Sequence, residues 1–109
     1  MFIAINHLKA KPGRGGDLEA RFAQPRGLDE QPGFISFELL KRTWSPMPDE
    51  EEVEHYLVST RWESIDDFVG WTRSDAFKEA HADGKPDFLA GGGRPAGYEV
   101  VLRRSKDES

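Results

Sequence analysis

The sequence has no cysteine, no long apolar run and no excess of basic residues, and each absence excludes a class of function. Without cysteine, the chain has no disulfide, no thiolate metal site and no cysteine nucleophile. No apolar run approaches the roughly 18 residues of a membrane-spanning helix, so we expect no membrane association. The net charge of -5 lacks the basic footprint that broad nucleic-acid binding requires, so we expect no nucleic-acid partner.

The beginning of the chain does not resemble an export signal. Its apolar run, from Met1 to Ile5, is short, lacks a basic leader and is interrupted by Asn6 and His7. A cytoplasmic location is therefore the expectation. A length of 109 residues suits one domain, which we expect over residues 1–104, with a disordered polar tail at 105–109.

Apolar residues that alternate predict four strands, and helical spacing predicts two helices. We expect Asp17 to cap the first helix and Ser64 to open the second, which should bend or restart at Ser74. Residues 87–97, with Gly91-Gly92-Gly93, are expected to form a loop. In chain order the expected elements are a strand at 2–8, a helix at 17–24, strands at 34–42 and 53–62, a helix at 64–82 and a strand at 98–103.

This order is typical of α+β proteins with the ferredoxin-like, split βαβ arrangement. Both helices would then cover one face of a four-stranded antiparallel sheet. The other face also carries apolar side chains, and a monomer would leave them in water as an unusually large patch. We therefore expect two chains to pack sheet against sheet as a homodimer. The apolar set assigned to this outer face is Ile3, Ile5, Ile35, Phe37, Leu39 and Leu57.

Few residues offer conventional catalytic chemistry. The serines lie in predicted caps or loops, with no nucleophile-elbow motif, and three scattered histidines do not predict a zinc site. Gly91-Gly92-Gly93 lacks the lysine and the strand-to-helix context of a phosphate loop. The acidic run Asp49-Glu50-Glu51-Glu52 is either a solvated hairpin tip or a docking patch for a basic redox partner.

The three histidines and one asparagine are the polar residues whose roles need to be weighed. His81 stands near the end of a predicted helix with Phe77 one turn behind it, which suits a core histidine or a haem ligand, because haem needs one histidine and an apolar wall. Asn6 is an amide among apolar neighbours, either bonded to nearby backbone or aimed as a donor into a pocket. His7 is expected to be structural or exposed, and His55, beside the acidic run, to be exposed.

The segment Ser74-Asp75-Ala76-Phe77-Lys78-Glu79-Ala80-His81, with Trp71 three positions before it, resembles the IsdG-type haem-degrading monooxygenases. These belong to the antibiotic-biosynthesis-monooxygenase (ABM) superfamily. Further matches fall in register at Asn6, 19–22, 33–34 and 62–64. The resemblance extends over residues 2–82 and then the last strand.

This resemblance implies a dimeric α+β barrel that binds one haem per chain as both substrate and cofactor. It implies that His81 is the proximal ligand of the haem iron and that Asn6, on the distal side, hydrogen-bonds an iron-bound oxygen species or a haem nitrogen. Trp71 would press on the haem and force it out of plane. These three are the implied catalytic residues, and the implied pocket walls, which equally suit a core, are Phe22, Phe68 and Phe77.

The implied reaction consumes haem, dioxygen and electrons from an external donor such as a reductase, and yields free iron and an open tetrapyrrole. Two alternatives remain: a haem-binding or haem-transfer protein without turnover, and a cofactor-free monooxygenase acting on a quinol or polyketide. Pro25 departs from the family pattern, which usually has an ordinary and often basic helix residue there, and Arg26 would replace that basic contact. Lys85 and Arg94 are either propionate contacts or solvated loop charges.

Overall fold

The computed structural model of the chain describes residues 1–24, 26–47, 51–82 and 84–106. These residues form five strands and three helices. None of the helices in these ranges is long and apolar enough to cross a membrane. In chain order the elements are β1 (Phe2–Ala10), α1 (Gly15–Phe22), β2 (Phe34–Lys41), β3 (Glu54–Trp62), α2 (Ile65–Thr72), α3 (Asp75–Ala80), β4 (Leu89–Gly92) and β5 (Ala96–Glu99).

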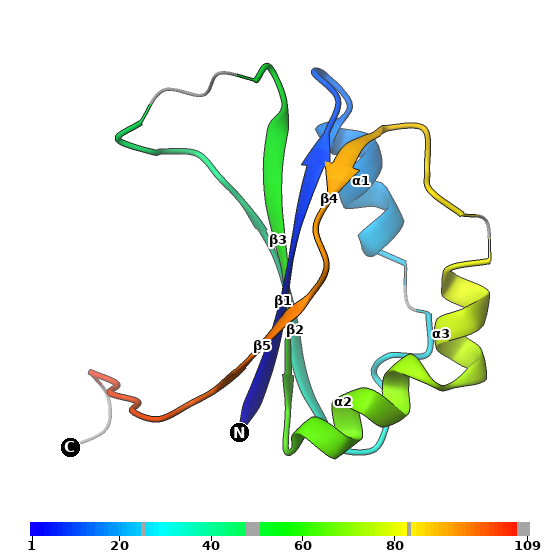
Figure 1. Cartoon of the computed structure of the whole chain (residues 1–109), viewed down its shortest axis with the longest axis vertical. Helices are drawn as coiled ribbons and strands as arrows, with labels where there is room; N and C mark the ends of the chain where they lie inside the picture. The colour runs from blue at the N-terminus through cyan, green and yellow to red at the C-terminus, as the bar shows by residue number, and fades with distance from the viewer. Residues whose placement is uncertain (25, 48–50, 83, 107–109) are drawn as a thin grey trace.

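The strands form one antiparallel sheet in the order β2-β3-β1-β4, with β5 also paired to β1. The helices lie on one side of this sheet, and the C-terminal segment after β5 extends to the other (Figure 1). The predicted ferredoxin-like α+β fold is thus confirmed. β1 is the central strand, because it pairs along its whole length with β3 and carries β4 and β5 in succession along its other edge.

The C-terminal part of the sheet corrects the sequence prediction. The expected loop at 87–97 contains β4, and β5 runs from Ala96 to Glu99 rather than from 98 to 103. Four glycines and one proline between residues 89 and 99 hid the alternation of these strands. Gly97 is needed for close packing, because a Cβ there would lie 2.4 Å from Cζ of Phe2. Beyond β5, Val101 and Leu102 are exposed rather than paired in a strand.

A β-bulge in β2 reverses which side chains face the helices. Phe34 pairs with Trp62 and Ser36 with Arg61, so Ile35 is the extra residue and is exposed. After the bulge, the inward residues are Phe37, which stacks on the ring of Phe22, and Leu39, which packs against the core. The assignment of Phe37 and Leu39 to the outer face was therefore wrong, because alternation across a bulge is shifted by one residue.

The helix boundaries follow their capping residues in two cases of three. Ser64 accepts a hydrogen bond from the Asp67 N–H (3.3 Å) and precedes α2, and Ser74 accepts one from the Phe77 N–H (3.1 Å) and precedes α3, as predicted. The predicted cap at Asp17 is wrong, because α1 begins at Gly15. There the carboxylate of Glu54 accepts from the Gly15 N–H at 2.8 Å, which holds the pKa of Glu54 below its ordinary value.

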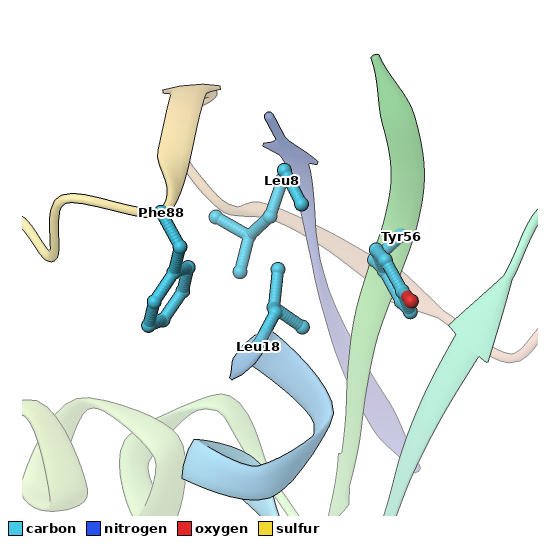
Figure 2. Packing of buried hydrophobic residues seen from close by; sticks show 5 residues of the cluster. Leu8, Leu18, Tyr56 and Phe88 are labelled. Carbon is cyan, nitrogen blue, oxygen red and sulfur yellow. The ribbon is translucent and has the colours of Figure 1, made fainter. Parts of the chain in front are cut away.

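Two clusters of buried side chains lie on the helix side of the sheet, one toward each end of β1. The cluster under α1 contains Leu8, Ala10, Leu18, Tyr56 and Phe88 (Figure 2). The second contains Phe2, Ala4 and Trp62, with Phe68 of α2 packed against it. Between them β1 presents Asn6 to the same side, because side chains alternate along a strand. The hydrophobic core is therefore divided at the middle of its central strand.

The outer face of the sheet has no covering element among the described residues. Its apolar side chains include Leu40, Leu57 and Tyr98, all more than a third exposed. His7 and His55 lie on this face with His7 Nε2 2.9 Å from His55 Nδ1, so His55 is half-buried and bonded rather than exposed as predicted. The pKa of His7 is lowered mainly by burial and, to a smaller extent, by neighbouring positive groups, of which His55 has the largest effect.

Some sequence predictions fall outside the described residues. These are the departure from the family pattern at Pro25, residue 83 directly after the predicted second helix, and the last part of the tail predicted to be disordered, residues 107–109. Of the acidic run, residues 49 and 50 are also outside, while Glu51 pairs with Lys9 at 3.2 Å.

Candidate functional site

A cavity of about 850 Å³ lies between the divided core, the helices and the loop before β4. Its walls come from the inner face of β1, β2 and β3, from all three helices and from the segment that contains Pro86 and Phe88. The six candidate residues from the sequence, which come from four different elements, all line this cavity. They are Asn6, Phe22, Phe68, Trp71, Phe77 and His81.

Asn6 brings an unpartnered polar atom to the cavity wall. Its side-chain Oδ1 is buried and has no hydrogen-bond partner in the part of the chain that the structure describes. A buried acceptor left in this state costs free energy, and nearly all such groups in native proteins are paired. The reading in which the amide bonds to nearby backbone is thus not supported for this oxygen. The arrangement suits a polar group supplied by a ligand.

His81 is held in one tautomer by its own helix. The residue caps the C-terminus of α3, and its Nδ1 lies 2.8 Å from the carbonyl oxygen of Phe77. Because a carbonyl only accepts, this hydrogen bond requires a proton on Nδ1, so Nε2 is the ring nitrogen that can bind a metal. The ring stacks on Phe77 with centroids 4.1 Å apart. His81 is exposed, so it is not a core histidine. A neutral imidazole oriented through one nitrogen is the usual state of a metal-binding histidine.

The restart of the helix at Ser74 separates Trp71 from His81. Trp71 belongs to α2 and His81 follows α3, so the two side chains are not fixed on one helical stripe. The indole contacts the ring of Phe77 edge-on, with centroids 5.4 Å apart and planes at 88°. The hydroxyl of Ser74 also donates to the Trp71 carbonyl at 2.7 Å. Phe77 therefore lies between the indole and the imidazole in the cavity wall.

Phe22 and Phe68 pack against the hydrophobic core and also form part of the cavity wall. Phe68 lies 5.5 Å from the ring of Phe2 and 5.9 Å from that of Trp62, centroid to centroid. Phe22 stacks on Phe37 at 6.0 Å. Both phenylalanines are half-buried and line the cavity. The two readings of these side chains do not exclude each other, because a wall that faces a cavity must be supported from behind.

Two arginines line the cavity, and sequence analysis pointed to only one of them. Arg26 was expected to supply a basic contact and does line the cavity, with a buried Nε that has no partner among the described residues. Arg21 was not singled out, although its position three residues after Leu18 places it beside the inward stripe of α1. Lys85 and Arg94 are exposed and outside the lining, in agreement with solvated loop charges.

The donor set at the cavity does not suit a metal ion held by protein alone. The described residues contain no group of three or more histidine, cysteine, aspartate or glutamate side chains that could hold a metal ion. A single histidine with one available ring nitrogen suits a metal ion whose other ligands belong to a planar, largely apolar organic group. The aromatic walls and the two nearby guanidinium groups match such a group, with carboxylates at its edge.

Comparison with known protein families and relatives gives a consistent picture. The family model described as antibiotic biosynthesis monooxygenase matches residues 1–83. A haem-degrading monooxygenase of Shouchella clausii is 37% identical over 93 residues, which cover 84% of this chain and 82% of the relative. A haem-degrading monooxygenase of Bacillus cereus is 37% identical over 106 residues, which cover 95% and 94% of the two chains.

Solved structures of similar shape include one haem degrader. The structure of MhuD from Mycobacterium tuberculosis, solved with two haems bound in its active site, aligns with a TM-score of 0.70 at 33% identity and covers 96% of this chain and 100% of MhuD. A Bacillus cereus protein described as a putative antibiotic biosynthesis monooxygenase aligns with a TM-score of 0.75 at 23% identity, with 99% and 98% coverage, and shows the shared fold alone.

Proposed function

The chain belongs to the antibiotic biosynthesis monooxygenase family, and we propose that within it this protein is a haem-degrading monooxygenase. The observation that carries the proposal is the state of His81. Its Nδ1 is bonded to the Phe77 carbonyl, and its Nε2 remains available at the wall of an aromatic cavity. The haem-degrading relatives and the haem-bound MhuD structure support the same substrate.

In this proposal, each side chain at the cavity has a defined role. His81 binds the haem iron through Nε2 as proximal ligand, and the Phe77 carbonyl fixes its ring. Asn6, the polar side chain at the centre of β1, hydrogen-bonds the reacting group on the other side. Trp71, which lines the cavity, would contact the porphyrin. Arg26 offers its buried Nε to a haem carboxylate, because a guanidinium pairs well with carboxylates.

Bound haem supplies the iron that activates dioxygen and the porphyrin carbon that is oxidised. The protein positions this substrate, excludes water with its phenylalanine walls and holds the polar groups in place. Insertion of oxygen from dioxygen with release of water consumes electrons and protons. We therefore propose that an external donor, supplied by a reductase, drives the reaction to an open tetrapyrrole and free iron.

The proposal can be tested by adding hemin to the purified protein and recording its absorbance. A shifted Soret band that decays in air with ascorbate or a reductase, with iron release, is the expected result. A stable band would identify a haem-binding or haem-transfer protein. No shift would leave a cofactor-free monooxygenase, acting on a quinol or polyketide, and would sink the haem proposal.

Variants on the two faces of the sheet test the ligand assignment more specifically. His81→Ala should abolish turnover, and Asn6→Ala should retain the Soret shift but lose turnover. The matched control is His7→Ala, because His7 lies on the outer face of the sheet, away from the cavity. Normal turnover by His81→Ala would show that the ligand assignment is wrong.

We also propose that the protein is a homodimer whose subunits meet at the outer face of the sheet. This face exposes Leu40, Leu57 and Tyr98, and the C-terminal segment, which extends to the same side, exposes Val101 and Leu102 (Figure 1). A second copy supplies both an apolar face and an apolar segment that match. Sedimentation at micromolar concentration should give twice the monomer mass, and a monomeric mass would refute the dimer.

A further inference from the structure

The helix that ends at the proposed iron ligand is weakly anchored through its own side chains. α3 has six residues and none of them is buried. An isolated helix of this length is not stable in water, so its position depends on tertiary contacts. At its N-terminus the Ser74 cap and the edge contact between Phe77 and Trp71 hold it to α2. Its C-terminus, next to His81, needs a separate anchor.

Two arginines from outside α3 supply that anchor. The Nη2 of Arg21, in the last turn of α1, donates to the carbonyl oxygen of Ala80 at 3.1 Å, and the Nη1 of Arg26 reaches the same oxygen at 3.5 Å. Ala80 is the last residue of α3 and directly precedes His81. Carbonyls at a helix C-terminus lack intrahelical partners and carry partial negative charge, so a guanidinium suits them.

The other carbonyls of this last turn are bonded from within the segment. The His81 N–H donates to the carbonyls of Phe77 (3.1 Å) and Lys78 (3.3 Å), and the Ala82 N–H donates to that of Glu79 (3.3 Å). The Ala80 carbonyl is thus the point at which the turn is tied to another element across the cavity. The Nδ1–H of His81 belongs to the same turn through its bond to the Phe77 carbonyl.

We propose that Arg21, assisted by Arg26, is a positioning residue that fixes His81 through the Ala80 carbonyl before any ligand enters the cavity. The tie holds the last turn of α3 closed, which keeps both the ring orientation and the tautomer of His81. Its meaning for catalysis rests on the proposed haem function, but the tie itself is a property of the haem-free protein. The alternative is that Arg21 only contacts a haem carboxylate. That role requires haem, so it predicts that replacing Arg21 leaves the last turn of α3 unchanged in the haem-free protein.

Amide hydrogen exchange in the haem-free protein separates these roles. In Arg21→Met, exchange at the His81 and Ala82 amides should accelerate roughly tenfold, because the closed turn loses its charge-assisted bond. Exchange in the paired β1–β3 ladder should stay unchanged and reports that the domain is folded. Arg73→Met is the matched control, since Arg73 is an exposed arginine outside the cavity lining. Unchanged exchange at His81 and Ala82 in Arg21→Met would overturn the proposal.

Arg26→Met gives a second, milder test. Its bond to Ala80 is longer, so the increase in exchange at the same two amides should be smaller than in Arg21→Met. A larger increase than in Arg21→Met would show that Arg26, not Arg21, is the principal anchor, which contradicts the assignment.

With hemin added, the iron–histidine vibration in the resonance Raman spectrum offers a further readout. A single band in the wild-type protein should broaden or split in Arg21→Met and remain single in Arg73→Met. A band of unchanged shape in Arg21→Met would mean that the arginine does not set the ligand geometry. If hemin does not bind the wild-type protein, the haem proposal fails, whereas the exchange result still decides whether Arg21 anchors α3.

Discussion

Replacing Asn6 with leucine should make the haem-free protein more stable. The side-chain Oδ1 is buried without a partner among the described residues, and its neighbours on the inner face of β1, Ala4 and Leu8, belong to the hydrophobic core. An unpaired buried acceptor costs about 1–3 kcal/mol. A leucine of similar length removes that cost and adds apolar contact across the gap in the core.

The expected gain of about 1–3 kcal/mol corresponds to a rise in Tm of roughly 5–15 °C for a small domain. Differential scanning calorimetry of the haem-free protein measures it directly. The variant should still bind hemin through His81 but lose turnover, so stability and activity should move in opposite directions. An unchanged or lower Tm would refute the reasoning, because it would show that the Asn6 amide is already satisfied, for example by water in the cavity.

Thr60→Val is the control for this prediction, with the opposite sign. Thr60 lines the same cavity from β3, but its Oγ1 accepts a hydrogen bond from the Trp62 indole N–H at 2.9 Å. Trp62 is fully buried, so valine would leave a buried donor without its partner. This change should lower the stability by about 1–3 kcal/mol. If both variants raised Tm, general apolarity of the wall, and not hydrogen bonding, would explain the result.

Two further predictions concern the framework around the site. Tyr56→Phe removes the hydrogen bond from the buried phenol to Glu19 at 2.6 Å and should cost about 1–2 kcal/mol in urea unfolding. Burial, and then the neighbouring Glu19, raise the pKa of Tyr56 above its ordinary value of about 10. The neutral phenol therefore stabilises the folded protein below pH ~10, and this stability is lost as the pH rises further. Tyr56→Phe should abolish that loss. Ser74→Ala removes the cap that accepts from the Phe77 N–H and should cost about 1 kcal/mol, with faster amide exchange at the start of α3; unchanged exchange at Phe77 would contradict the role of this cap.

Local patterns predicted the parts of the fold that depend on neighbouring residues. Leu57 was assigned correctly to the outer face of β3, because a regular strand keeps its period and its alternate residues, Tyr56, Thr60 and Trp62, are buried on the other face. Ser64 and Ser74 marked two helix starts, since a capping hydroxyl acts within three residues of its own position. The separation of Trp71 and His81 onto different helices followed from the second of these caps.

Long-range geometry accounts for the errors. The bulge at Ile35 depends on how β2 pairs with β3, and no residue within β2 signals it. β4 consists largely of small residues with weak strand preference, and it is held by its pairing with β1. The hydrogen bond from Arg21 to Ala80 joins residues far apart in the chain, so only the folded structure places them together.

The site itself was reached by two routes. Periodicity placed Phe77 and His81 on one helical face, and the strand pattern marked Asn6 as an amide among apolar neighbours. The family resemblance added Trp71 and connected the four residues, which no local pattern does. The cavity gathers all four, and their catalytic roles remain predictions that the variants above test.

The gap between the two core clusters gives the proposed substrate a structural role. Under the proposed function, haem fills the space beside Asn6 and links the cluster under α1 to the cluster under α2, so that it acts as the missing central part of the hydrophobic core. A ligand that binds only the folded state raises stability in proportion to its free concentration and affinity. Under the same proposal, each turnover would remove the group that stabilises the folded domain, so formation of the product would lower the stability of the region around the cavity.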